Sequence, residues 1–588
     1  MTFSAGVHYR VQVADLHAHL FDVTLTVSRP LAKQRLQLPA WIPGSYLIRE
    51  FARHVQGLTA RQGRRQLTVG HPDKHSWDVE CVPDRPLTLQ YQVYAFDNSV
   101  RAAWLDTARG FFNGTALLMR ALGQDDQAHT LDIVCPEGVD NWQLATSLKP
   151  LKADSKGFGT YAAVDYDELV DSPVEMGAFW SGEFVARGVP HRFVVAGAAP
   201  SFDGDRLLAD AKKICETAMD FWRSAAHDRY VFMLNAVDNS YGGLEHRNST
   251  ALICKRQDLP RHGETGTNEG YTTLLGLISH EYFHTWNVKR LRPAEFATFD
   301  YQQENYTDLL WFFEGFTSYY DDLLLRRAGL LNDGAYLKLL NKTINQVLQT
   351  PGRLVQSVAQ ASFDAWIKYY RQDENTANAT VSYYTKGSLV ALCLDLSLRE
   401  QNKTSLDAVM RELWRRCDAG PMSEADLMAV LRQLGGRSYA KEIRSWVRGV
   451  DELPLKPLLA AHGVDVKNET AQLAQALGLR VQEDHGIRIQ TVLREGAAEQ
   501  AGLAAGDEWL AVEVAPDKGG QAPSGWRLHK LDDLRLYAPK GARITAIVAR
   551  DKQLLRLPIT VPLDETSWKL TIRDAPLVST WLASATES

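Results

Sequence analysis

The first part of the chain alternates apolar and polar residues in the period of two that β-strands require. The clearest stretches are residues 9–13, 22–27 and 87–94. Pro and Gly interrupt this pattern, as in Trp41-Ile-Pro-Gly-Ser45. We therefore expect an antiparallel, sandwich-like domain that is rich in β-strands over residues 1–175.

From about residue 204, apolar residues recur at spacings of three and four, which is typical of helices that bury one face. The expected helices are 205–222, 271–287, 305–328, 335–349, 388–399, 405–417 and 423–434. A β-like stretch, 230–237, separates the first two helices. This order predicts a mixed domain over 176–395 and a helical region over 396–466.

Strand patterns return after about residue 470. The expected strands are 486–492, 508–514, 542–550 and 554–561, and a short helix is expected at 530–536. Together they predict a compact unit within 467–588, which also includes a C-terminal tail. The whole chain is thus expected to be a multidomain α+β protein.

Composition narrows the class of protein. The 588 residues are 45% hydrophobic and 23% charged, which suits several globular cores, and the net charge of -6 argues against a nucleic-acid binder. No stretch approaches the roughly 20 apolar residues of a membrane span. The six cysteines are scattered and indicate no disulfide framework. The chain opens without the pattern of a secretory signal, so we expect a cytoplasmic location.

The strongest chemical motif is His280-Glu-Tyr-Phe-His284, within the expected helix 271–287. Residues four apart lie on one helix face, so both imidazoles can bind one metal ion. Glu281 is displaced by one position and therefore reaches the water on the metal, as a general base must. We expect His280 and His284 to be ligands of one Zn²⁺ ion and Glu281 to be catalytic.

A catalytic zinc site needs a third protein ligand. Glu314 is the best candidate, because it lies in the apolar run Leu310-Trp-Phe-Phe-Glu-Gly-Phe316 and a buried carboxylate is costly unless it is paired or bound to metal. Glu304 and Asp308 are rivals in a more polar stretch, where water can solvate them. We expect Glu314 to complete the metal site.

The segment Ser382-Tyr-Tyr-Thr-Lys-Gly387 places tyrosines close to a glycine. A tyrosine hydroxyl beside the metal can donate to the oxyanion that forms during peptide hydrolysis. Without the zinc motif, a core or surface tyrosine would be the simpler interpretation.

The segment Tyr241-Gly-Gly-Leu-Glu-His246 follows a strand-like stretch. Gly242 and Gly243 allow the backbone to run close to a substrate. Glu245 can then hold a positively charged amino terminus, although a solvated turn carboxylate is the alternative.

Four segments in this order resemble the aminopeptidase N superfamily of gluzincins: Gly242-Gly-Leu-Glu-His246, His280–His284, Phe313-Glu-Gly315 and Tyr384-Thr-Lys-Gly387. The chain is most similar to the glycyl aminopeptidase family. Trp41-Ile-Pro-Gly-Ser-Tyr-Leu-Ile-Arg49, His284-Thr-Trp-Asn-Val-Lys-Arg290 and a terminal unit that resembles a PDZ domain carry this resemblance.

Two departures from the aminopeptidase N pattern are similar to the glycyl aminopeptidase subgroup. The interval from His284 to Glu314 is longer, and a loop is expected around 293–303. His246 also replaces the usual Asn. These departures put the substrate specificity in doubt but leave the chemistry intact.

The resemblance implies a thermolysin-like catalytic domain over 176–395 and removal of an N-terminal residue, small ones such as Gly or Ala preferred, from peptides with a free N-terminus. It implies that Glu245, with Gly242 and Gly243, binds the substrate and that Tyr384 stabilises the tetrahedral intermediate, with Tyr383 as the alternative donor.

The PDZ-like unit implies a peptide or protein ligand, with the strand 486–492 beside any groove, although a packing role is as plausible. Two other functions stay open. One is a zinc endopeptidase, and the other is a peptide-binding scaffold with vestigial catalysis.

Overall fold

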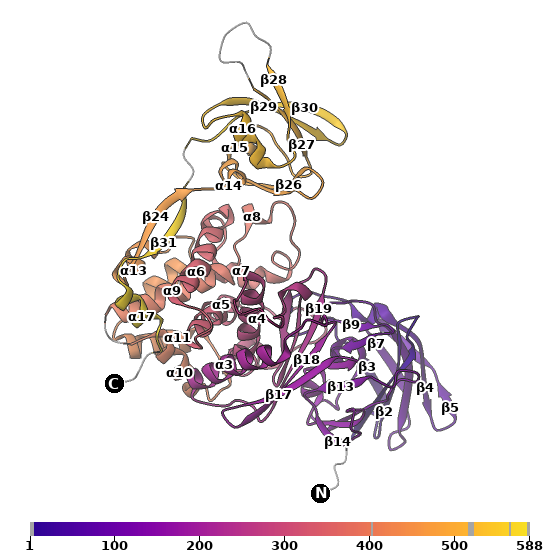
Figure 1. The fold of residues 1–588 in the computed structure, drawn as a ribbon. Helices are drawn as coiled ribbons and strands as arrows, with labels where there is room; N and C mark the ends of the chain where they lie inside the picture. The colour runs from indigo at the N-terminus through magenta and orange to yellow at the C-terminus, as the bar shows by residue number, and fades with distance from the viewer. Residues whose placement is uncertain (1–4, 402–403, 515–522, 564–565, 585–588) are drawn as a thin grey trace. The chain divides into compact units, whose positions relative to one another are not determined.

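The computed structural model describes residues 5–401, 404–514, 523–563 and 566–584 (Figure 1). The first four residues, where the pattern of a secretory signal would begin, lie outside this part. The chain divides into two compact units. The first comprises Met1–Tyr306, Tyr320–Leu330 and Trp414–Ser423, and the second comprises Thr307–Tyr319, Leu331–Leu413 and Glu424–Ser588.

The first unit begins with three β-sheets. The eight-stranded sheet has the order β14 (Lys149–Ala153), β15 (Gly159–Ala163), β12 (His129–Ile133), β1 (Val7–Asp15), β2 (Leu20–Val27), β8 (Leu87–Tyr94), β4 (Val55–Gln62) and β5 (Arg65–Leu67). One four-stranded sheet has the order β13 (Gln143–Thr146), β16 (Val174–Gly177), β10 (Arg109–Phe112) and β9 (Ala103–Leu105). The other has the order β11 (Arg120–Ala121), β3 (Lys33–Gln37), β7 (Ser76–Glu80) and β6 (Val69–Asp73).

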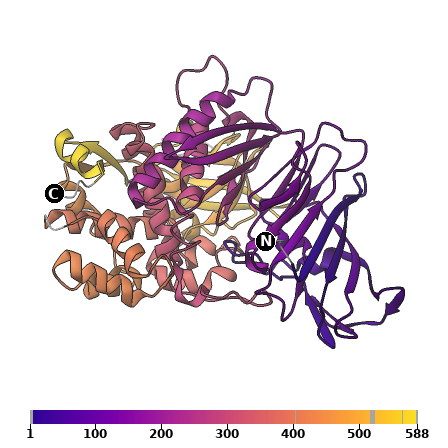
Figure 2. The same ribbon diagram turned by 90° about the horizontal axis from the view of Figure 1, so that it is seen from below.

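The alternation seen in the sequence explains these sheets. On β2, every second residue from Phe21 to Val27 is buried, and β1 buries Val7, Tyr9 and Val11 beside it. Antiparallel pairing aligns Val7 with Val27, so the apolar side chains of both strands enter the same core. The three strands expected from the sequence in this region are confirmed. Figure 2 shows that this indigo region consists almost entirely of strands.

A five-stranded sheet follows in the same unit. Its order is β17 (Trp180–Ala186), β18 (Val189–Ala196), β19 (Tyr230–Val237), β21 (Ser249–Lys255) and β20 (Gly242–Glu245). The helices α3 (Gly204–Trp222) and α4 (Glu269–Phe283) pack against this sheet and against each other. Strand β20 is the terminal strand of this order, so one of its sides has no neighbouring strand within the sheet. The Gly243 carbonyl on β20 accepts a hydrogen bond from Arg101 at 3.4 Å.

Helix α4 ends earlier than the expected 271–287. His284 is its C-cap, and Val288 adopts a positive φ of 108° that no helix allows. The next long helix, α5 (Leu310–Arg327), begins five residues later than the expected 305–328. Before it, the Asn305 side chain bonds the backbone of Asp300 and so closes a turn. Side-chain bonds to a nearby backbone compete with helix formation.

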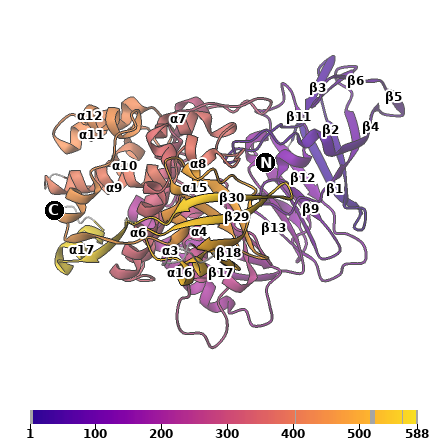
Figure 3. The same cartoon turned by 90° about the horizontal axis from the view of Figure 1, so that it is seen from above.

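The second unit is mainly helical. Its helices include α6 (Asp333–Leu348), α7 (Val358–Phe363), α8 (Thr376–Ala379), α9 (Thr385–Glu400), α11 (Glu424–Gly435), α13 (Leu455–Ala461) and α17 (Ala575–Leu582), and α10 (Leu406–Arg416) begins in it. Helix α9 packs against α6 and α13, and Figure 3 shows α9 beside α6. Among the described residues, no helix combines the length and the apolar character needed to cross a membrane.

The end of the second unit carries another sheet. Its order is β25 (Leu479–Gln482), β26 (Ile487–Val492), β27 (Glu508–Val514), β29 (Arg543–Arg550) and β30 (Gln553–Thr560), and β28 (Ser524–Arg527) pairs with β27. Strand β24 (Val464–Thr470) pairs with β31 (Thr566–Ile572), so the chain enters and leaves this sheet along one ribbon.

The strand expected at 486–492 lies at β26. It pairs with β25 on one side, and on the other side its ladder to β27 covers Ile487 and Arg488. A hollow lined by Gly486, Ile487 and Arg488, together with residues of β27 and β28, lies beside this strand, and its role as a ligand groove stays a prediction. Strand β25 is the terminal strand of the sheet and offers an open edge. The four domains expected from the sequence, with the three boundaries between them, stay predictions.

Candidate metal centre

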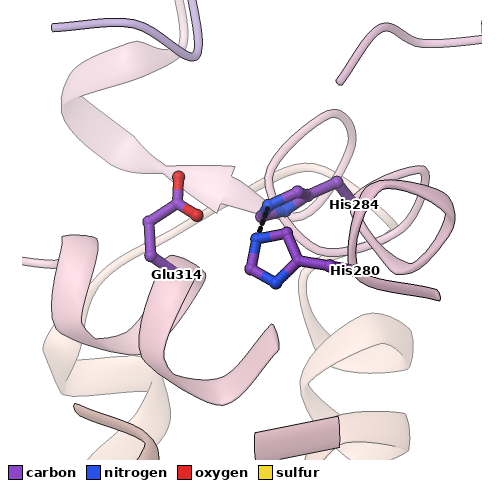
Figure 4. Close-up of side chains that lie close together, drawn as sticks. All are labelled: His280, His284 and Glu314. Atoms are coloured by element: carbon purple, nitrogen blue, oxygen red, sulfur yellow. Dashed lines mark hydrogen bonds between the residues drawn. The ribbon is translucent and has the colours of Figure 1, made fainter. Parts of the chain in front are cut away.

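The two motif histidines face each other at the end of helix α4. Their Nε2 atoms lie 3.0 Å apart (Figure 4). Nδ1 of His280 lies 3.0 Å from Oδ2 of Asp321, and Nδ1 of His284 lies 2.8 Å from the carbonyl oxygen of Asn287. A carboxylate and a carbonyl can only accept a hydrogen bond, so both Nδ1 atoms carry the hydrogen.

This arrangement leaves a lone pair on each Nε2 atom. Two lone pairs at 3.0 Å repel each other unless a cation lies beside them. Two imidazoles bound to one tetrahedral Zn²⁺ at about 2.0–2.1 Å would hold their nitrogens roughly 3.3 Å apart. The donor atoms and their spacing therefore fit a divalent metal ion.

Glu314 supplies the third donor of this cluster. One ligand atom from each of His280, His284 and Glu314 can be chosen so that all lie within 4.8 Å of one another. Figure 4 shows the Glu314 carboxylate on its helix, facing the ring pair. Glu314 is 2% exposed, as the apolar run around it predicts. The residues can therefore hold one ion with two nitrogen ligands and one oxygen ligand.

The two rival carboxylates have other partners. Glu304 accepts a hydrogen bond from the Tyr306 hydroxyl, and Asp308 pairs with Arg448 at 3.2 Å. Within the described part of the chain, neither belongs to a group of His, Cys, Asp or Glu that could hold a metal.

A second cluster joins Glu245 of β20 to Glu281 and His284, whose ligand atoms also lie within 4.8 Å of one another. Both carboxylates are buried, each 5% exposed. Gly243 is necessary here, because a Cβ on that residue would overlap Oε1 of Glu281. Gly44 approaches from the N-terminal segment, and a Cβ there would overlap the Glu245 carboxylate. The expected recognition glutamate and the expected base therefore lie next to one metal ligand.

Tyr384 is the N-cap residue of α9 and is partly buried, whereas the Tyr383 side chain is fully buried. Burial, and after it the charge of Glu314, raises the pKa of Tyr384 well above its ordinary value. The hydroxyl is therefore neutral at physiological pH and can donate a hydrogen bond near Glu314.

Asp321 and Asn287 support the two candidate metal-ligand histidines but were not identified from the sequence. Asp321 lies seven residues after Glu314 on α5, and this spacing of two turns was the only signal that could have pointed to it. Burial raises the pKa of Asp321, and the hydrogen bond from His280 opposes that effect. Asn287 acts through its backbone carbonyl, which no sequence pattern reports.

Two family models match the chain. The Peptidase M61 N-terminal domain matches residues 8–178, and the M61 glycyl aminopeptidase model matches residues 273–390. Among solved structures, an aminopeptidase N family protein from Idiomarina loihiensis is 36% identical, with a TM-score of 0.92 over 98% of this chain and 100% of that chain. An M1 zinc metallopeptidase from Deinococcus radiodurans is 14% identical, with a TM-score of 0.49 over 77% of this chain and 95% of that chain. No curated protein matches the chain.

The fold and the matched family define a metallo-aminopeptidase, which is a hydrolase of peptides. The chain belongs to the M61 glycyl aminopeptidase family. Of the family resemblances drawn from the sequence, the likeness of the terminal unit to a PDZ domain stays a prediction.

Proposed function

We propose that this protein is a zinc-dependent aminopeptidase that removes N-terminal residues, small ones such as Gly and Ala, from peptides. The observation that carries the proposal is the pair of clusters that share His284. One holds the three candidate metal ligands, and the other holds a second buried carboxylate, Glu245, beside the candidate base Glu281. A free amino group bound at Glu245 would bring the first peptide bond of a substrate to the metal.

His280, His284 and Glu314 would hold the zinc ion. When bound, zinc lowers the pKa of its water towards about 7 and polarises the carbonyl of the bond to be cut. Asp321 and the carbonyl of Asn287 keep the hydrogen of each ring on Nδ1, so that both Nε2 atoms would be available as ligands of the ion.

Three side chains of the protein perform the remaining steps. Glu281 accepts the proton of the attacking water and passes it to the leaving amine. Tyr384 donates a hydrogen bond to the oxygen on which negative charge develops. Glu245 fixes the ammonium group of the substrate, and this register makes the enzyme an exopeptidase.

The crowding around Glu245 supports a preference for small N-terminal residues. Gly44 and Gly243 bring two backbone segments against the two carboxylates, leaving no room even for a Cβ. An N-terminal Gly or Ala brings few atoms into this region.

The test is hydrolysis of a glycine or alanine chromogenic amide beside its N-acetylated twin. Each substrate is tested with and without a chelator, and zinc is then restored. We expect cleavage of the free amine alone, its loss with the chelator and its recovery with zinc. Cleavage of blocked peptides would indicate an endopeptidase. Stoichiometric zinc binding without cleavage of a broad peptide panel would indicate a scaffold.

Two variants assign the roles. Glu281→Gln should abolish turnover while zinc binding persists, because the general base does not coordinate the metal. Glu245→Gln should raise KM for the free amine, because the charge that pairs with the ammonium is lost. Glu304→Gln is the matched control, since the Glu304 carboxylate accepts a hydrogen bond from Tyr306 and, within the described part of the chain, lies outside both clusters. Equal effects of Glu304→Gln and Glu245→Gln would contradict the assignment.

We propose a thermolysin-like arrangement for the catalytic part, supported by the metal-binding helix α4 against a sheet with the edge strand β20. For the terminal unit we propose a PDZ-like module. The open edge of β25 supports it, because PDZ domains bind a peptide by adding it as a strand to a sheet edge.

A further inference from the structure

Asp171 lies directly after helix α2 (Tyr166–Val170) and is its C-cap residue. Its carboxylate contacts two segments of chain far from it in the sequence. Oδ1 accepts hydrogen bonds from Nδ1 of His246 at 3.0 Å and from Nζ of Lys289 at 2.8 Å, and Oδ2 accepts from the backbone N–H of Arg247 at 3.0 Å. The side chains of His246 and Lys289 are 1% and 9% exposed.

This carboxylate is held in its charged form. Burial alone would raise the pKa of Asp171, but the charges and hydrogen bonds of Lys289 and His246 outweigh it and lower the pKa below its ordinary value. A buried ion pair with several hydrogen bonds has one preferred geometry, so its partners are fixed relative to one another.

His246, one partner of Asp171, is the neighbour in sequence of Glu245, the proposed amine-binding carboxylate. His246 directly follows Glu245 at the end of β20, and its backbone N–H donates to the carbonyl of Ser249 at 2.9 Å. Asp171 therefore fixes the ring and the backbone immediately beyond Glu245 through two of its three hydrogen bonds.

Lys289, the other partner of Asp171, also bonds the backbone of His284, a proposed metal ligand. The backbone N–H of Lys289 donates to the carbonyl of His284 at 3.1 Å, and the carbonyl of Asn287 accepts from the His284 ring at 2.8 Å. Between them lies Val288 at a φ of 108°. A β-branched residue is strained at positive φ, and such a conformation persists only when both of its flanks are fixed.

Two sets of contacts fix the turn around Val288. Within the turn, the backbone N–H of Val288 donates to the carbonyl of Leu291 at 2.8 Å, and the N–H of Leu291 donates to the carbonyl of Trp286 at 2.9 Å. From outside the turn, Asp171 forms an ion pair with the side chain of Lys289, the residue after Val288. The segment whose carbonyl orients His284 is thus bonded to the carboxylate of Asp171 through Lys289.

We propose that Asp171 is a positioning residue that aligns Glu245 for the substrate ammonium group and His284 for the metal, through His246 and Lys289 respectively. Asp171 acts through its two partners and takes no part in the chemistry. The role of its two targets rests on the proposed function.

The experiment uses the full-length chain with the substitution Asp171→Asn, which keeps the shape and removes the charge. Zinc affinity is measured by competition with a chromogenic chelator, which needs no catalysis. KM for a free-amine glycine amide is then measured at saturating zinc. We expect zinc to bind about 10–100-fold more weakly, as for other residues that orient metal ligands. We also expect KM to rise about tenfold or more, because Glu245 is displaced.

Two further variants separate positioning from a general loss of stability. Lys289→Met should weaken zinc binding by a similar factor, and the double variant should add little to that loss, because both substitutions break one link. Glu175→Gln is the matched control. Glu175 is a buried carboxylate in the same unit, and its two oxygens accept hydrogen bonds from Arg109, at 2.8 and 2.7 Å.

Unchanged zinc affinity and KM in Asp171→Asn would overturn the proposal, and so would equal changes in Glu175→Gln. Fully additive losses for Asp171 and Lys289 would also overturn it. If the parent protein binds zinc but cleaves no peptide, the proposed function fails, while the zinc-affinity comparison still decides whether Asp171 positions His284.

Discussion

Gly315 and Gly387 meet where helices α5 and α9 cross. A Cβ on Gly315 would lie 2.6 Å from Cα of Gly387, and one on Gly387 would lie 2.6 Å from the carbonyl oxygen of Trp311. Glu314 precedes the first glycine, and Tyr384 lies one helical turn before the second. The close crossing therefore brings a candidate metal ligand and a candidate oxyanion donor together. This proximity explains why, after burial, the charge of Glu314 contributes to raising the pKa of Tyr384.

Gly387→Ala should force α5 and α9 apart, because the added methyl group overlaps the backbone. Overpacking of this kind costs about 1–3 kcal/mol, so we expect a lower thermal midpoint. The displacement of Tyr384 should also lower kcat. Gly334→Ala in α6 is the control, since its Cβ would meet Asn332 Oδ1 at an ordinary 3.5 Å. The same midpoint and kcat in Gly387→Ala as in the parent protein would contradict this account of the crossing.

Tyr384→Phe removes only the hydroxyl. Because loss of one oxyanion donor costs about 10²–10³-fold in rate, kcat should fall by that factor while zinc binding stays unchanged. Tyr383→Phe should have a small effect, since Tyr383 is fully buried and the N-cap position belongs to Tyr384. Steady-state kinetics and zinc titration measure both. A larger loss in Tyr383→Phe would make Tyr383 the donor.

Asp321→Ala should weaken zinc binding by about 10–100-fold, because it removes the acceptor that keeps the hydrogen of His280 on Nδ1. Asp322→Ala changes the neighbouring carboxylate on the same helix and serves as the control. Competition with a chelator measures both affinities. The role of Asp321 would be refuted by equal affinities in the two variants.

Acid should destabilise the fold by protonating two buried histidines that pack against helix α4. His191 and His227 place Nε2 2.9 and 3.1 Å from the hydroxyl of Tyr282, on the helix face opposite the metal ligands. Burial lowers the pKa of His191 to about 4 and that of His227 to about 3. The unfolded chain, with pKa values near 6.5, then binds more protons, so stability rises with pH from about 4 to 6.5 and is fully present above that range.

The expected slope is about 1.4 kcal/mol per pH unit for each histidine in that window. His191→Gln should reduce the slope of unfolding free energy against pH, measured with chelator present. His262→Gln should leave the slope unchanged, because the His262 side chain is 66% exposed. If the slope in His191→Gln equals that of the parent, the buried histidine does not cause the acid sensitivity.

The secondary structure could be predicted where local pattern and tertiary packing agree. Strands β1, β2 and β8 lie where the alternation indicated, because one residue in two enters a core. Strand β19 lies at the β-like stretch 230–237, and all of its residues except Val237 are buried. Element ends were less predictable. Helix α4 stops at Phe283 because the strained turn at Val288 is held from outside the helix, by bonds to distant residues.

The sequence by itself determined the chemical identities of the candidate site. Spacing of four on a helix places His280 and His284 on one face, and an apolar run makes Glu314 costly without a metal, so local geometry was enough to predict all three. Only the tertiary structure decided what aligns them. Asp321 and the Asn287 carbonyl contact the two histidines, Gly44 lies against Glu245, and Asp171 bonds Lys289 near His284. The approach of these segments depends on packing and on loop geometry, and neither of these has a periodic signal in the chain.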